Sequence, residues 1–463
     1  MSENNIEQTE KNLYDSNVTN KLGHLPIGKL LLQYSIPAII GTLVVAMYNI
    51  VDRIYIGKGV GPEAISGLAL TFPIMTLSVA CGMLVGAGSA ARISIILGKN
   101  DEKMAQHILG NALILSLIIS SSFAIVNYIF MDEILRAFGG TDVTIPYAKE
   151  YLEILIPFSI LNNLSFGFNN MMRASGYPKK AMLTMVISAL TNVILDPILI
   201  FGFNMGIRGA AIATVISMAI TTVWVMNHFR NKKHAVSFNK EGFKLKSRII
   251  LSIVSIGMSP FLINITASVV NVFMNKALLN HGGDLAIGAF GIINSYASIM
   301  IFAIIGLCQG MQPIVGYNYG AKHFDRVKKA FAITAVAATI ITTIGFALSL
   351  TIPSTLVKGF TSDEELTQIA SLGLKIVFLA FPIVGWQIVT TNFFQSIGIA
   401  WKAIFLSLSR QVLFLLPMIW ILPGIYGLNG AWFALPIADV ISSAVALGFL
   451  LYQLKLFKKA RLA

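Results

Sequence analysis

The chain has 463 residues, of which 56% are hydrophobic and only 12% are charged. Soluble domains carry about 25% charged residues, so this composition argues against a soluble protein and favours one embedded in a lipid bilayer. The formal net charge of +13 is expected to reflect basic cytoplasmic loops beside anionic lipid and not nucleic-acid binding, because no nucleic-acid-binding module is legible.

The amino-terminal segment, residues 1–29, is expected to be a polar cytoplasmic tail, because it lacks the pattern of a cleavable signal peptide. After it, long charge-free stretches alternate with charged loops and suit a hydrocarbon core of ~30 Å. They run over Leu30–Val51, Ala64–Ala91, Ile108–Met131, Ile154–Met172, Gly209–Asn227, Ile249–Asn275, Leu285–Ala321, Ala330–Val357, Ile376–Trp401, Gln411–Ala438 and Val440–Leu454. With the segment around Asp196, they predict an all-α integral membrane protein of twelve transmembrane helices.

The loops alternate in charge. One set is basic, as at Lys99, Lys179 and Lys233, and the other set is acidic or mixed, as at Glu63 and Asp363. The excess of basic residues in cytoplasmic loops of membrane proteins predicts a multi-pass protein of the plasma membrane with both termini in the cytoplasm.

The two halves of the chain repeat at a shift of about 222 residues, which places Gly88 on Gly310 and Gly98 on Gly320. Six helices in each half predict two pseudo-symmetric bundles related by an axis along the membrane normal, an arrangement typical of alternating-access carriers. The alternative is a duplication without mechanical meaning. The predicted parts are an N-lobe (30–229), a cytoplasmic linker (230–248), a C-lobe (249–454) and a cytoplasmic tail (455–463).

Asp196 is the only charged residue between Ala181 and Ile207. A carboxylate within a membrane span costs roughly 2.5–3.5 kcal/mol on insertion scales and usually marks an ion or substrate path. Asn192 lies one turn earlier on the same face. Pro197 removes the amide that would bond a carbonyl one turn back and is expected to kink the helix, and Pro37 is expected to allow the first span to bend in the same way. This combination favours a cation or proton site.

The helix rise of about 1.5 Å per residue places Asp52, Asp196 and Thr214 at one level in the outer half of the membrane. Tyr48 lies one turn below Asp52. Hard cations such as Na⁺ take oxygen ligands, and two adjacent carboxylates can share one proton because like charges disfavour ionisation of both. The plainer alternatives are that Asp52 is an interfacial loop residue and that the amide and hydroxyl are ordinary polar packing groups.

Three sequence stretches carry a family resemblance: Pro37 to Gly57, which includes Val51-Asp52-Arg53; Arg173-Ala174-Ser175-Gly176; and Leu190 to Pro197. With the six-plus-six layout, they resemble the multidrug and toxic compound extrusion (MATE) family of antiporters over nearly the whole chain. The resemblance implies a monomer, not an enzyme, that uses no cofactor and exports small organic, often cationic, compounds against inward H⁺ or Na⁺. It also implies a coupling site in the N-lobe formed by Asp52, Asn192, Asp196 and Thr214, with Asn169 lining the same lobe.

The second half departs from another branch of that family, which has coupling acids in the seventh and tenth spans. Here the seventh span carries Ser268, Asn271 and Asn275, and no acid lies between Ile376 and Trp401. Coupling through the C-lobe is therefore not expected. Arg410 is expected to pair with Asp439 as a structural contact. Candidates for a permissive substrate pocket are Gln309, Gln312, Gln387, Trp386 and Tyr296.

Two other functions stay open at this point. A lipid-linked oligosaccharide flippase of the same architecture needs a cationic cavity for a pyrophosphate, and few arginines, among them Arg53, Arg92 and Arg410, are available. An integral-membrane enzyme needs a nucleophile, metal ligands or an acid–base pair. The six histidines fall at loops, tails or span ends, and Cys81 and Cys308 are expected to be small buried hydrophobic residues.

Overall fold

The computed structural model of the protein describes residues 21–59 and 62–462. The predicted tail therefore lies mostly outside the described residues. The described part is helical and contains no β-strand, which confirms the all-α class. Its helices are α2 (Ile27–Gly59), α3 (Pro62–Gly98), α4 (Glu102–Ile129), α5 (Met131–Ala137), α6 (Ile145–Leu155), α7 (Ser159–Ala174), α8 (Pro178–Pro197), η1 (Ile198–Gly202), α9 (Gly206–Arg230), η2 (Glu241–Phe243), α10 (Ser247–Gly320), α11 (Phe324–Thr351), α12 (Pro353–Lys358), α13 (Glu364–Val377), η3 (Phe378–Ala380), α14 (Phe381–Ser396), α15 (Ala400–Leu408), η4 (Ser409–Leu415) and α16 (Leu416–Leu462).

The number of membrane crossings follows from helix lengths. Within the described ranges, nine helical segments are long and apolar enough to cross a bilayer, and the bent pair α6–α7 adds a tenth. Helix α10 has 74 residues and the segment Ala400–Lys459 has 60, too long for one crossing at 1.5 Å per residue. Each folds back at a glycine with positive φ, 66° at Gly283 and 58° at Gly427, a conformation that side chains disfavour. Counted as two crossings each, these segments complete the predicted twelve.

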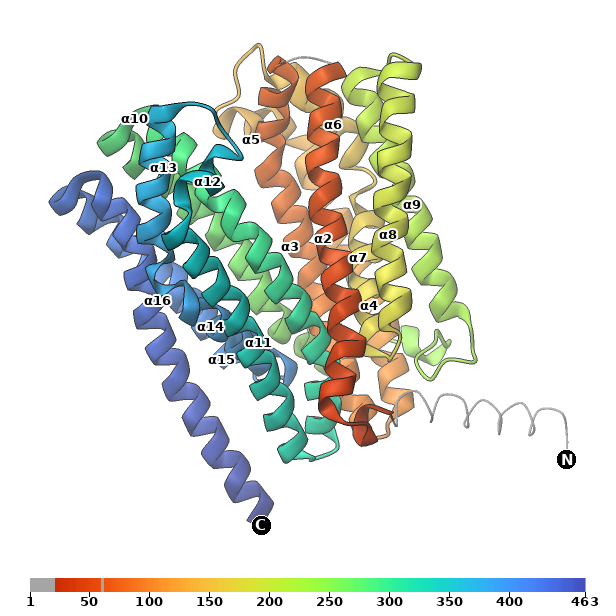
Figure 1. Ribbon diagram of the computed structural model, residues 1–463. Helices are drawn as coiled ribbons and strands as arrows, with labels where there is room; N and C mark the ends of the chain where they lie inside the picture. Colours follow the sequence, from red (N-terminus) through yellow and green to blue (C-terminus); the bar gives the residue numbers. More distant parts are fainter. Residues whose placement is uncertain (1–20, 60–61, 463) are drawn as a thin grey trace, which may run out of the picture.

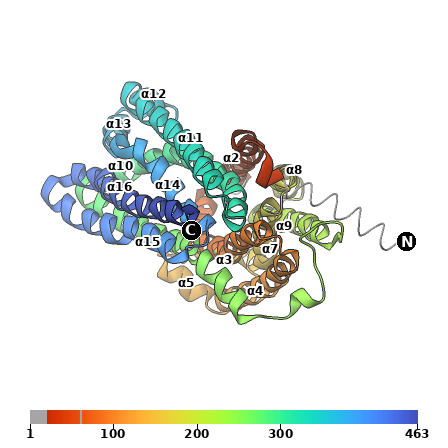
Figure 2. The ribbon, with the colours of Figure 1, turned by 90° about the horizontal axis from the view of Figure 1, so that it is seen from below.

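The helices form two groups (Figure 1). Helices α2 to α9 make up the first group, the N-lobe, and α10 to α16 make up the second, the C-lobe. Seen from below, the two groups lie side by side, and α2 and α11 meet where they adjoin (Figure 2). In Figure 1 the C-lobe helices tilt away from the N-lobe toward the top, the end opposite the carboxyl terminus.

Glycines at matching positions of the sequence repeat bring the backbones of the two lobes close together. Gly98 lies against the carbonyl of Tyr317, and its counterpart Gly320 lies against the carbonyl of Ile95. A second matching pair lies farther along these helices: Gly88 of α3 lies against the carbonyl of Ile253 on α10, and its counterpart Gly310 of α10 lies against the backbone of Ser35 on α2. A side chain at these glycines would overlap the facing backbone, so the small residues permit the close approach that membrane helices use for association. All these contacts lie in the half of the spans nearer the chain termini.

The segment between the lobes is fastened to the N-lobe. Asn111 of α4 donates to the carbonyls of Gly242 and Lys244 at 3.1 and 3.0 Å, and its Oδ1 accepts from the amide of Lys246 at 2.9 Å. Gln106, one turn earlier, donates to the carbonyl of Ala235 at 3.0 Å. These bonds hold the linker against α4 up to Lys246, directly before α10 begins at Ser247.

An aromatic cluster closes the same end of the N-lobe. The Tyr177 hydroxyl lies 2.7 Å from Nδ1 of His234, and the ring of His234 stacks on His228 at 4.3 Å. Burial, with a smaller effect of the nearby Lys180, lowers the pKa of His234 to about 4. The ring is therefore neutral near pH 7, and the cluster joins the start of α8 to the end of α9 as an uncharged contact.

Candidate cation site in the N-lobe

Asp196 lies at the end of α8 and is fully buried. Neither of its carboxylate oxygens receives a hydrogen bond from a donor in the described part of the chain. The α-helix ends at Pro197, and the π-helical turn Ile198–Gly202 follows directly. Such wider turns within helices are frequent at functional sites. A buried carboxylate without a protein donor requires a proton or a cation to offset its desolvation.

Asp52 brings the second carboxyl group from α2. The side chains of Asp52 and Asp196 lie within hydrogen-bonding reach of each other, and α2 packs along α8. Two carboxylates at this separation are not stable when both are ionised and uncompensated. They can hold one proton between them or bind one cation together.

An amide and a hydroxyl complete the ring of oxygen atoms. Asn192, one turn before Asp196, donates from Nδ2 to Oγ1 of Thr214 on α9 at 3.2 Å. This bond fixes the amide with its Oδ1 free, since no donor in the described residues reaches that oxygen. The oxygen ligand set of Asp52, Asp196, Asn192 and Thr214 fits a hard monovalent cation such as Na⁺.

Two tyrosines lie beside the acid pair. Tyr48 lies one turn before Asp52 and is close to both carboxylates. Tyr151 of α6 lies beside Thr214 and is also close to both acids. Sequence reasoning missed Tyr151 because it is flanked by Glu150 and Glu153, which place it in an apparent loop. The structure shows instead that α6 is the first part of a bent span.

Asn169 and Pro37 are two further predicted residues, and the described part of the chain shows no hydrogen bond between either of them and the acid pair. Asn169 on α7 is buried, and its Oδ1 has no hydrogen-bond partner among the described residues. No hydrogen bond in that part of the chain joins it to the acids, so its role stays a prediction. Pro37 lies inside α2, fifteen residues before Asp52, which is about 23 Å along the helix.

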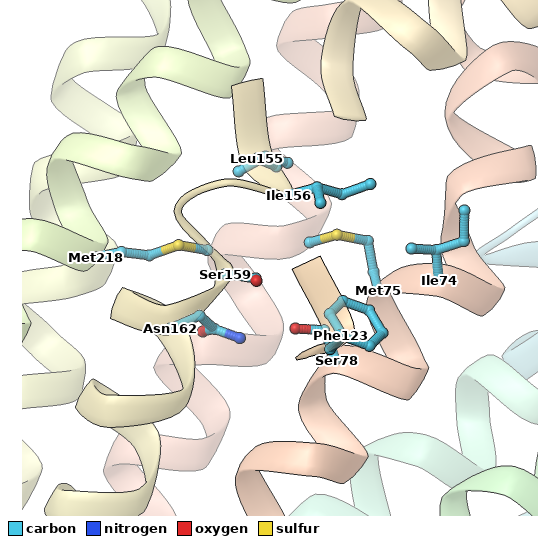
Figure 3. A pocket seen from close by; sticks show the side chains of 9 residues that line it. All are labelled: Ile74, Met75, Ser78, Phe123, Leu155, Ile156, Ser159, Asn162 and Met218. Carbon is cyan, nitrogen blue, oxygen red and sulfur yellow. The ribbon is translucent and has the colours of Figure 1, made fainter. Parts of the chain in front are cut away.

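A cavity in the N-lobe is lined by side chains of α3, α4, α6, α7 and α9 (Figure 3). Met75 and Met218 enter it from opposite sides, with Ser159 between them. Met218 is one turn beyond Thr214, and the lining residue Leu155 is one turn beyond Tyr151. The Ser159 hydroxyl has no hydrogen-bond partner in the described chain. The cavity is therefore an apolar space with a free polar group, one helical turn from the cluster.

The predicted substrate residues of the C-lobe are not gathered around this cavity. Tyr296 is buried, and its hydroxyl donates to the carbonyl of Gly345 at 3.1 Å. Gln312 contacts the carbonyl of Ala87 in the N-lobe at 3.4 Å. Gln309 has a buried Oε1 without a partner in the described residues, Gln387 is buried, and Trp386 packs against the main hydrophobic core. Their role as a substrate pocket stays a prediction.

Arg410 and Asp439 pair as the sequence predicts, with Nε donating to Oδ1 at 2.7 Å. Arg410 lies in the π-helical turn Ser409–Leu415, and Asp439 is buried in α16. The two cysteines are likewise buried and unpaired with each other.

Asp439→Asn is expected to destabilise the protein by about 1–3 kcal/mol, because it leaves a partly buried guanidinium without its counter-charge. Thermal unfolding in detergent, followed by fluorescence, measures the change. Asp132→Asn is the matched control, since its pair with Lys149 at 3.0 Å is exposed and such pairs contribute about 0–1 kcal/mol. Equal shifts for the two variants would contradict a structural role for the buried pair.

Within the described ranges, no group of three or more histidine, cysteine or acidic side chains is placed to hold a metal ion.

Comparison with known proteins agrees with this architecture. The protein-family model MatE matches residues 37–198 and 256–421. The chain is 28% identical to the Multidrug export protein MepA of Staphylococcus haemolyticus, over 93% of this chain and 94% of that protein. It is 38% identical to the MATE multidrug transporter DinF-BH, whose structure was determined with a bound ligand. That match has a TM-score of 0.86 and covers 93% of this chain and 96% of the other. An outward-facing MATE transporter of the MOP superfamily superposes with a TM-score of 0.90 at 24% identity, over 95% of this chain and 98% of that one, which supports the fold.

Proposed function

This chain belongs to the MATE family of transporters, and we propose that it exports small organic, often cationic, compounds across the plasma membrane in exchange for H⁺ or Na⁺. The buried Asp196 beside Asp52 is the observation that carries this proposal, because the Asp196 carboxylate receives no hydrogen bond from a donor in the described chain. The MepA relatives and DinF-BH are multidrug transporters by name. Members of this family are transporters and not enzymes.

Exchange requires two states that expose the site alternately. The lobes meet through glycines in the half nearer the termini, and they diverge at the other end (Figure 1). With the predicted cytoplasmic termini, this form is closed to the cytoplasm. We propose that the N-lobe (30–229) and the C-lobe (249–454) move as units. A cation shifts the equilibrium only as far as it binds one state better than the other, which the convergent oxygens of the acid site provide.

An export assay tests this function. Cells that lack their major exporters and express the chain are loaded with ethidium, a fluorescent organic cation, and dye retention is followed by fluorescence. Expression is expected to lower retention several-fold, and collapse of both cation gradients is expected to abolish the difference. Equal retention in expressing and empty cells, for ethidium and a panel of other organic cations, would contradict the proposal.

The flippase alternative gains no support from the site. A pyrophosphate needs several free cationic groups, and Arg410 is already paired with Asp439. The described charges of the candidate site are acidic, which favours a cation over a phosphate.

A further inference from the structure

The stretch just before α2 is held by the opposite lobe. Residues 21–24 form a helical turn, and Leu22 within it is fully buried. Along the chain this turn leads into α2, the first helix of the N-lobe. Its hydrogen-bond partners, however, are Asn318 at the end of α10 and Arg326 at the start of α11, both in the C-lobe.

The contact is a compact network of four hydrogen bonds. Arg326 donates from Nη2 to the carbonyls of Leu22 and Leu25 at 3.0 and 2.7 Å. Asn318 donates to the same Leu22 carbonyl at 3.0 Å, and its Oδ1 accepts from Nε of Arg326 at 2.8 Å. Gly23 lies close to the ring of Tyr317, since an added Cβ would be 3.1 Å from Cε1.

The chemistry of this network is that of a helix cap supplied by another part of the fold. The last carbonyls of a helical turn have no partner within the turn, and a cation is favoured at that end. Arg326 satisfies two such carbonyls at once, and its planar fork is itself oriented by Asn318. Without Arg326, the carbonyl of Leu25 would lose the guanidinium that donates to it.

Helix α2 therefore links a contact with the C-lobe near its start to the acid site of the N-lobe near its end. The residues just before it are tied to the C-lobe by the network, and Thr42 within the helix adds a bond to the carbonyl of Phe302 at 3.2 Å. Its later turns carry Asp52 to the acid site of the N-lobe. Separation of the lobes at the cytoplasmic side must either break the network or bend α2 between these points.

We propose that Arg326 and Asn318 form a latch that holds the cytoplasmic side closed by clamping residues 21–25, which lead directly into α2 of the N-lobe, onto the C-lobe. The inference rests on the alternating-access function proposed above. The latch is engaged in the form described here, and its release accompanies opening to the cytoplasm. Arg326 is thus a positioning residue that sets the balance between the two states and does not contact the transported compound.

Distances between the lobes test the latch without any substrate or coupling ion. Spin labels are attached to Lys179→Cys in the N-lobe and Lys458→Cys in the C-lobe, both exposed positions, in the full chain, whose native cysteines are buried. Pulsed electron paramagnetic resonance measures the distance between them. Arg326→Ala is expected to raise the population with separated cytoplasmic ends on the order of tenfold, since it removes hydrogen bonds from a charged donor.

Two further variants keep the test decisive. Arg326→Lys preserves the charge but loses the fork, so an intermediate shift is expected. Gly23→Leu pushes the turn off Tyr317 without altering Arg326, and a shift in the same direction is expected.

Lys328→Ala is the control on the same helix, because its contact with Asp325 is long and exposed, at 4.0 Å. Wild-type distances in both Arg326→Ala and Gly23→Leu would overturn the latch.

The outcome is separable from that of the proposed function. If the variants leave the distances between the labels unchanged while dye export is normal, the latch is wrong and the proposed export function stands. If the variants shift the distances but the chain exports none of the tested compounds, the latch stands and the proposed export function is wrong.

Discussion

Asp196→Asn is expected to abolish drug export, lowering gradient-driven ethidium efflux by more than tenfold. The substitution keeps the shape of the side chain but removes its ability to take up and release a proton or to neutralise Na⁺. Because Asp196 is fully buried without a protein donor in the described chain, the neutral amide does not destabilise the fold through lost contacts. Growth inhibition and efflux are measured in cells with equal amounts of wild-type and variant protein in the membrane.

The control for this variant is Asp142→Asn. Asp142 is also an acid, but its pair with Arg136 at 3.1 Å is highly exposed, so unchanged export is expected. Asp52→Asn should resemble Asp196→Asn, and the double variant should be little worse than either one, because groups that act as a unit are not additive. Wild-type resistance in Asp196→Asn cells would contradict the role of the acid pair.

Much of this site could be predicted from residue spacing alone. The rise of a helix is constant, so counting from the span ends placed Asp52, Asp196 and Thr214 at one level. The structure brings these side chains together, with Asn192 bonded to Thr214. A buried carboxylate is also rare enough in a span that the sequence pattern itself indicated a site.

Features that depend on pairs of distant segments could not be predicted in this way. Tyr151 lies on α6, the first part of a span that bends by 59° before α7. Pro157 lies at that bend, but the acidic neighbours Glu150 and Glu153 place Tyr151 outside the span predicted from the sequence. The hydrogen bond from Arg326 to the carbonyl of Leu22 joins positions about 300 residues apart. Every residue has a backbone carbonyl, so the sequence does not mark this one as an acceptor. The repeat indicated the symmetry of the glycine contacts, but not which half of the membrane they close.

The choice of coupling ion is the last prediction. We expect Na⁺ and H⁺ to compete for the acid site, with a slight preference for H⁺ as the driving ion. If both bind the same pair of neighbouring carboxylates, each must weaken the other by an equal factor. Protonation removes the negative charge that holds Na⁺, so the half-saturating Na⁺ concentration should rise as the pH falls. The rise approaches about tenfold per pH unit once a proton occupies the pair.

Purified protein in sealed vesicles separates the two ions. An imposed pH gradient in Na⁺-free buffer should drive ethidium movement, and added Na⁺ should slow it more strongly at high pH than at low pH. If the pH gradient drives no movement and a Na⁺ gradient alone restores it, the preference for H⁺ is wrong. The double variant Asp52→Asn, Asp196→Asn is the control, because a shared site predicts that it loses the response to both ions. Transport that persists in this variant would show that coupling takes place elsewhere, since the remaining amide and hydroxyl groups of Asn192 and Thr214 carry no charge to exchange.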